Sequence, residues 1–192
     1  MNLPFTLAPV GDCAHTLLPD GLELTAQART DLFVDPAGDG SDLPDAGRLV
    51  GTPPPGDFTF SAHVTVDFTT TYDAGVLLLH VSDRQWAKLC FEYSPQHKPT
   101  AVTVVTKDFS DDANAFTVEG NSLHLRITRT GRAWAFHAST DGAWWHLLRL
   151  FSLDGDVSLG FLAQSPLGQG CRAVFREIAF TPGAPTDLRN GT

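Results

Sequence analysis

Apolar residues recur along this chain in short runs, either at every second position or without a polar break. In SLHLRITRT, residues 122–130, Leu123, Leu125 and Ile127 would face one way and the polar residues between them the other. Gly, Pro, Asp and Asn separate the runs, and no window of about eleven residues shows a capped helical period. The sequence therefore predicts about a dozen strands and few helices.

The predicted strands divide into clear runs and weaker ones. The clear runs are residues 58–68, 74–82, 86–94, 100–107, 122–130, 133–140, 143–151, 157–165 and 171–180, and the weaker ones are 22–26, 31–34 and 48–52. RTGRA at 129–133 and STDGA at 139–143 predict tight hairpin turns in which glycine supplies a positive φ. This pattern favours a β-sandwich, a jelly roll or a closed barrel.

The apolar pattern also predicts what covers each strand. Alternation of the kind seen at 122–130 is typical of the outer layer of a sandwich, with one buried face and one solvated face. In contrast, GVLLLHV at 75–81 is apolar on both faces, so we expect it in mid-sheet with something covering its second side. We expect a single domain over residues 1–192, with its core at about 20–180 and a frayed tail at 181–192.

Composition and charge exclude several classes of function. The chain has 192 residues, 42% of them hydrophobic, which suits a packed globule, and its net charge of -9 disfavours nucleic acid or an anionic membrane as the main partner. We find no run of about 20 apolar residues and no signal-peptide pattern at the N-terminus. The odd cysteine count, Cys13, Cys90 and Cys171, shows no paired framework. Together these features predict a cytoplasmic protein.

Five ordered segments carry a resemblance to a known family. They are TDLFVDPAG (30–38), DAGVLLLHVSDRQWAKLCFE (73–92), VTVVTKDFSDD (102–112), STDGAWWHLLRLF (139–151) and GFLAQSP (160–166). Over roughly residues 20–180, the chain resembles the concanavalin A-like domain family called "regulation of enolase protein 1". The resemblance implies a two-sheet antiparallel β-sandwich of jelly-roll type with a concave face. It implies no particular chemistry, because one fold supports many functions.

The stretch WAKLCFE, residues 86–92, places unusual chemistry on one face of a strand. Trp86, Lys88, Cys90 and Glu92 would project together, about 7 Å apart in succession. On a concave sheet, an aromatic face suits the C–H surface of a sugar ring, and charged groups suit its hydroxyls. The alternative is an ordinary charged exterior, although a tryptophan there would leave a large apolar area in water.

Neighbouring segments could complete this candidate site. Asp73 begins the preceding strand, and only one of Thr103 and Thr106 on the following strand can share the face. Adjacent Trp144 and Trp145 should point to opposite sides, so that one enters the core, unless both pack under loops. Arg149 has the parity of Trp145, and the family resemblance favours these two as the relevant pair. The predicted ligand-binding residues are Asp73, Trp86, Lys88, Glu92, Thr106, Trp145 and Arg149.

Two alternatives to simple binding remain open. In the first, the chain is an enzyme in which Glu92 acts as acid or base and Lys88 tunes its pKa. Glycosidases need two carboxylates, about 5–5.5 Å apart for retention or about 6.5–9.5 Å for inversion. Glu92 is the only acid on its strand and the glucanase-type Glu-x-Asp-x-x-Glu triplet is absent, which favours binding, although Asp73 could be the second carboxylate. In the second, the chain is a regulatory protein-interaction module, with a homodimer also possible.

Metal ions and cofactors have little support in the sequence. The acidic run Asp35–Asp45, with Asp39 and Asp42, could attract Ca²⁺, but its spacing differs from an EF-hand and a solvated turn is the favoured interpretation. The histidines are scattered singly, and Cys90 is expected to be a buried structural thiol. We therefore predict no cofactor and no metal, and expect a carbohydrate or another small polar ligand as the partner.

Overall fold

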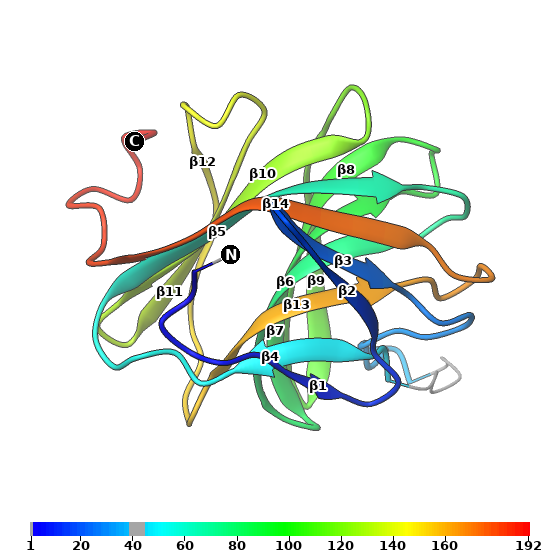
Figure 1. Cartoon of the computed structure of the whole chain (residues 1–192), viewed down its shortest axis with the longest axis horizontal. Helices are drawn as coiled ribbons and strands as arrows, with labels where there is room; N and C mark the ends of the chain where they lie inside the picture. Colours follow the sequence, from blue (N-terminus) through cyan, green and yellow to red (C-terminus); the bar gives the residue numbers. More distant parts are fainter. Residues whose placement is uncertain (1, 39–44) are drawn as a thin grey trace.

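Two antiparallel sheets stacked face to face make up the structure, a computed structural model that describes residues 2–38 and 45–192 (Figure 1). In spatial order, sheet A contains β1 (Ala8–Val10), β4 (Arg48–Gly51), β13 (Ser158–Gln164), β6 (Ala74–Ser82), β7 (Gln85–Tyr93), β8 (Pro99–Lys107) and β9 (Phe109–Thr117). Sheet B contains β12 (His146–Ser152), β11 (Ala133–Ser139), β10 (Ser122–Thr130), β5 (Phe58–Asp67), β14 (Arg172–Pro182), β3 (Gly21–Thr25) and β2 (Ala14–Leu18). The described residues include no helix long and apolar enough to cross a membrane. The predicted all-β, two-sheet sandwich is confirmed.

All the clear runs became strands, and the differences from prediction have local causes. β12 starts at His146 rather than residue 143, because Asp141 Oδ1 accepts hydrogen bonds from the backbone N–H groups of Ala143 and Trp144 and holds them in a turn. Residues 31–34 form no strand, and Thr30 and Asp31 make only isolated bridges. β9 was not predicted because FSDDANAFT is largely polar, as suits an edge strand that is mostly exposed. β1 and β2 were also missed.

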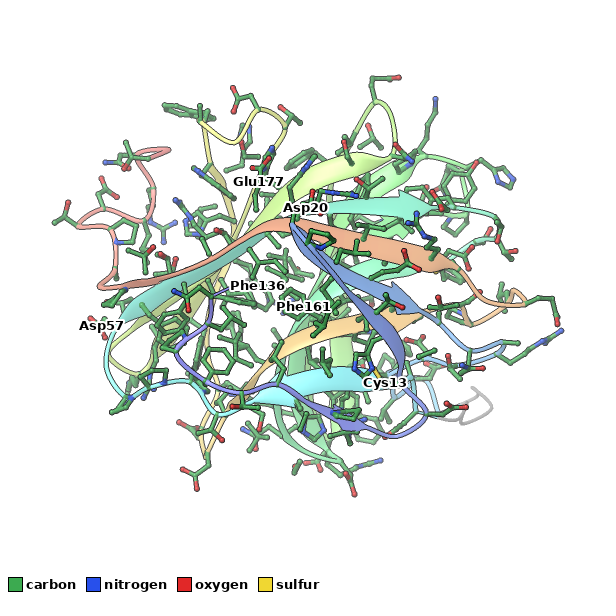
Figure 2. All side chains as sticks on the ribbon, in the orientation of Figure 1. Cys13, Asp20, Asp57, Phe136, Phe161 and Glu177 are labelled. Atoms are coloured by element: carbon green, nitrogen blue, oxygen red, sulfur yellow. The ribbon has the colours of Figure 1, made fainter. Side chains whose placement is uncertain are left out.

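The main core lies between the two sheets. Phe161 of β13 packs against Phe60 of β5 and Phe175 of β14, with ring centroids 5.3 and 4.8 Å apart, so aromatic rings join the two layers. Phe136 and Phe161 lie in the interior in Figure 2, whereas Asp57 lies at the margin of the molecule. The predicted alternation of 122–130 is confirmed, because the apolar residues of β10 all belong to this core.

A second apolar layer covers the outer face of sheet A. The residues that form this layer, which we call the covering segment, are 30–34 and 45–46. Leu32 and Ala46 of this segment pack on a buried cluster whose sheet members are Val50, Ala74, Val76, Leu78, Trp86, Cys90, Val102, Val104 and Leu162. The prediction that something covers the second side of residues 75–81 is therefore confirmed.

Hydrogen bonds fix the covering segment to sheet A and its connections. The N–H of Val34 donates to Ser110 Oγ of β9 at 2.9 Å, and the N–H of Ser110 donates to the carbonyl of Val34 at 2.9 Å. Within the segment, the N–H of Ala46 donates to the carbonyl of Asp31 at 2.7 Å. The N–H of Ser165 donates to the carbonyl of Thr30 at 3.2 Å. These bonds satisfy several backbone groups of a segment that is not part of a strand, as burial of the backbone requires.

The C-terminal segment, residues 183–192, lies against sheet B beside β12 rather than fraying as the sequence predicts (Figure 1). Two side chains of sheet B and one backbone N–H just before β12 donate hydrogen bonds to its backbone oxygens. They are His137 Nε2 to Leu188, the N–H of Trp145 to Gly191, and Arg126 Nη2 to Thr192, each at 2.9 Å. These bonds, which the local sequence does not reveal, hold the segment in place.

Candidate functional site

A pocket of 230 Å³ opens where the covering segment meets the outer face of sheet A. We call it the Lys88 pocket. Strands β7, β8, β9 and β13 and two non-strand segments contribute its lining, which consists of Asp31, Phe33, Tyr72, Lys88, Glu92, Val102, Val104, Asp112 and Gln164. It is smaller than the ~300–1,000 Å³ clefts that hold drug-sized ligands, so its size suits a single sugar unit or a similar molecule.

Lys88 is buried at the base of this pocket, with 1% of its surface exposed. Its Nζ donates to Asp31 Oδ1 at 3.0 Å and to Gln164 Oε1 at 2.9 Å. Burial lowers the pKa of Lys88, but the Asp31 carboxylate and its hydrogen bond, with smaller contributions from Cys90 and Glu92, outweigh burial and raise it. The ammonium group therefore stays charged and fixes the orientations of Asp31 and Gln164.

Glu92 is the partly buried acid of the same pocket. Burial raises the pKa of its carboxyl to about 8; Lys88 opposes this shift, and the charges of Asp31 and Asp112 add to it. No hydrogen bond to its side chain is found in the part of the chain that the structure describes. A largely protonated carboxyl at neutral pH can donate one hydrogen bond and accept another. Glu92 is thus the group in the pocket best placed to engage a ligand.

Two aromatic side chains lie at the rim of the Lys88 pocket. Phe33 and Tyr72 both line it, and each keeps 37% of its surface exposed. Lys88 Nζ lies 6.0 Å from the centroid of the Phe33 ring. Tyr72 has a φ of 69°, and its carbonyl accepts a hydrogen bond from Gln164 Nε2 at 3.5 Å. The aromatic platform expected from Trp86 is therefore available from two other residues.

The structure does not bring the seven predicted site residues together in one place. Only Lys88 and Glu92 line the pocket. Trp86 shares their side of β7, but it is 2% exposed, so the solvated face predicted for residues 86–92 is wrong. The covering segment explains this error, since it replaces water over that face. Thr106 lies opposite Trp86 and is also buried, with its Oγ1 2.8 Å from Ser110 Oγ.

The Asp73 carboxylate is fully engaged by hydrogen bonds from its own turn and from Ser165. Its Oδ2 accepts hydrogen bonds from the N–H and Oγ1 of Thr69 and from the N–H of Thr70, at 2.8 to 2.9 Å. Its Oδ1 accepts from Ser165 Oγ at 2.6 Å, and the residue is fully buried. Because both of its carboxylate oxygens accept these hydrogen bonds, Asp73 holds the turn before β6 in place. It does not line the Lys88 pocket.

Neither Trp145 nor Arg149 lines the Lys88 pocket, and each interacts with a different partner. The Arg126 guanidinium lies 4.3 Å from the Trp145 ring centroid, whereas Arg149 Nη2 lies 2.9 Å from Asp111 Oδ2. The prediction that one of Trp144 and Trp145 enters the core is wrong. Trp144 is 55% exposed and Trp145 is partly buried, because both precede β12 in a turn rather than alternating along a strand.

Several pocket residues were not predicted, although the resemblance motifs contain most of them. Asp31 and Phe33 lie in TDLFVDPAG, Val102 and Val104 in VTVVTKDFSDD with Asp112, and Gln164 in GFLAQSP. Motif segments far apart in the chain thus converge on one pocket. Tyr72 directly precedes a motif and had no signal of its own.

The described residues contain no group of three or more His, Cys, Asp and Glu side chains that could hold a metal ion. Asp39 and Asp42 of the acidic run lie outside the described residues. Of its described members, Asp35 Oδ1 accepts from the N–H of Ala37 at 2.8 Å, and Asp45 Oδ2 lies 3.5 Å from Arg48 Nη1. The calcium alternative for this run stays a sequence prediction.

Comparison with known proteins identifies the family. The family model described as "Protein of unknown function (DUF1349)" matches residues 15–183. The chain belongs to the DUF1349 family. Regulation of enolase protein 1 from Saccharomyces cerevisiae is 26% identical over 140 residues, which cover 71% of this DUF1349 chain and 70% of the yeast protein.

Solved structures similar to this DUF1349 chain share its sandwich fold. A functionally unknown protein from Saccharomyces cerevisiae matches with a TM-score of 0.81 and 21% identity, covering 94% of this chain and 97% of the yeast chain. The carbohydrate-binding module CBM66 from Bacillus subtilis matches with a TM-score of 0.61 and 12% identity, covering 94% and 98%. A GH43 protein from Bacillus licheniformis matches with a TM-score of 0.68 and 13% identity, covering 84% of this chain but only 33% of its own.

Proposed function

We propose that this chain binds a carbohydrate unit, or another polar molecule of similar size, in the Lys88 pocket. The observation that carries the proposal is a small pocket in which fixed polar groups lie below two exposed aromatic rings. Gln164 and Glu92 supply hydrogen-bonding atoms for hydroxyls, and Phe33 and Tyr72 supply apolar faces for C–H groups. In this proposal the face predicted to be concave is the outer face of sheet A.

The similar structures support this proposal by their names. CBM66 is a carbohydrate-binding module, and its structure matches this chain over nearly the full length of both. Binding without catalysis is the simpler function because Asp31 is already engaged by Lys88, and because Glu92 has no hydrogen-bond partner among the described residues that would activate it as a nucleophile.

A panel of monosaccharides tests the proposal by NMR titration of the native protein. We expect at least one saturable ligand and a roughly 3- to 10-fold loss of affinity in Phe33→Ala, since an aromatic contact contributes about 0.5–1.5 kcal/mol. Phe109→Ala is the matched control, because Phe109 is also exposed but does not line the pocket. An absence of any ligand in the panel, or equal affinity in Phe33→Ala, contradicts the proposal.

A second candidate function is acid catalysis on a sugar-like substrate. The observation in its favour is that Glu92, with a pKa of about 8, lines one pocket with Asp31 and Asp112. One protonated and one ionised carboxyl are what glycoside cleavage requires. Nitrophenyl glycosides test this function. Turnover that falls above about pH 8 and disappears in Glu92→Gln supports it, and lack of turnover across the set contradicts it.

A further inference from the structure

A buried arginine without an acidic side-chain partner lies beneath the C-terminal segment, far from the Lys88 pocket. Arg126 of β10 is 9% exposed, and burial lowers the pKa of its guanidinium to about 10. No ion pair joins it to an Asp or Glu among the described residues. A buried cation is costly unless it is paired, so its lack of a side-chain partner calls for an explanation.

The groups around Arg126 are also hydrogen-bond donors. His137 lies opposite Arg126 on β11, and its Nε2 must carry the proton because it bonds to the carbonyl of Leu188. The N–H of Trp145 points at the carbonyl of Gly191. Arg126 Nε and the Thr128 hydroxyl are buried without any partner in the described structure, and so is His137 Nδ1, which is an acceptor because Nε2 carries the proton. Sheet B and the turn before β12 therefore present several donors to the C-terminal segment, which satisfies them only in part.

A hollow of 300 Å³ opens directly beside this donor cluster. Ser61, the strand partner of Arg126, and Trp145, whose ring stacks on the guanidinium, both line it. His63 and His124 stack there with ring centroids 4.2 Å apart, and Asp141 and Glu177 also line the hollow. Their carboxylates can accept hydrogen bonds from hydroxyl groups.

We propose that Arg126, His137 and Trp145 form a second binding site, for the carboxylate or phosphate of a small hydroxylated acid, and that the C-terminal segment covers this site in the present structure. The oxygen of Thr192, 2.9 Å from Arg126 Nη2, takes the position of a ligand oxygen. Arginine recognises carboxylate and phosphate groups through paired N–H donors, and a single bond from the Arg126 guanidinium is found within the described residues. The body of the ligand would lie in the adjacent hollow against Trp145.

Gly191 offers a way to open the site without altering its donors. Its φ is +85°, and an added Cβ would lie 2.6 Å from ring atoms of Trp144. A β-branched residue disfavours this conformation, so Gly191→Val should release the segment. Calorimetric titration with gluconate and with glycerol phosphate should then show affinity at least about 10-fold higher than in the native chain. Glucose, which has no charge, should not show this gain, and the acid that binds more tightly identifies the oxyanion.

Adding Arg126→Gln to Gly191→Val should remove at least about 10-fold in affinity, because bonds to a charged group are lost. The matched control is Arg172→Gln, since Arg172 is an exposed arginine already paired with Glu23 and Asp67. Arg126→Lys, which keeps the charge, guards against misfolding and should retain part of the affinity. Binding unaffected by Arg126→Gln, or no binding of either acid to Gly191→Val, overturns the proposal. Loss of sugar binding in Phe33→Ala addresses the Lys88 pocket separately.

Discussion

The Nζ of Lys88 lies 3.0 Å from Oδ1 of Asp31, although 57 residues separate them in the chain. This pair joins the covering segment to sheet A at the base of the pocket. Asp31→Asn would leave the ammonium buried without a counter-charge, so we expect a loss of about 3 kcal/mol in the free energy of unfolding. Urea denaturation measures it. Asp20→Asn, which breaks the exposed pair with Arg176, should cost less than about 1 kcal/mol, and a similar cost for both variants would contradict the prediction.

Glu92 should make the stability of the protein depend on pH. Its pKa is raised from 4.5 to about 8 in the folded chain, so between these values the folded state binds more protons than the unfolded state. The contribution of Glu92 to stability is therefore full below about pH 4.5 and is lost as the pH rises to about 8. Denaturation midpoints should fall more steeply over this window in the native protein than in Glu92→Gln. Glu119→Gln, at an exposed residue, should keep the native slope.

Trp86 should prove important for folding, whatever the ligand. Replacement by alanine would open a large cavity between sheet A and the covering segment, at a cost of about 3–5 kcal/mol. Trp144→Ala removes an exposed indole and should change stability by about 0.5 kcal/mol or less. Thermal unfolding measures the stability loss in both variants. A larger loss in Trp144→Ala than in Trp86→Ala would contradict the burial of Trp86.

Asp73→Asn should separate stability from binding. In the asparagine variant, an amide NH₂ group replaces one of the two Asp73 oxygens and faces N–H or O–H donors that it cannot accept from. We therefore expect a loss of about 1–3 kcal/mol in the free energy of unfolding. Because Asp73 does not line the Lys88 pocket, the folded variant should bind its ligand with native affinity. Titration below the unfolding temperature checks this, and a selective loss of affinity would return Asp73 to the site.

The fold was predictable because alternation is a local property, as Leu123, Leu125 and Ile127 show. The surroundings of a strand are not local. The alternation of side chains along a strand correctly placed Trp86, Lys88 and Glu92 on one face of β7. It could not show that Leu32, from a segment distant in the sequence, packs over that face. For the same reason Lys88 and Glu92 were predicted as site residues, whereas their pocket neighbours Asp31 and Gln164 were not.

The Lys88 pocket is built from two kinds of structure. Lys88, Glu92 and Gln164 form a floor on hydrogen-bonded strands, whereas Phe33 and Tyr72 form walls on segments outside any strand. Strand residues hold their positions with precision, and loop residues can change without repacking the sheet. Under the proposed binding function, ligand preference can therefore diverge among related chains through substitutions at Phe33 and Tyr72 alone, while the polar floor and the sandwich beneath it stay the same.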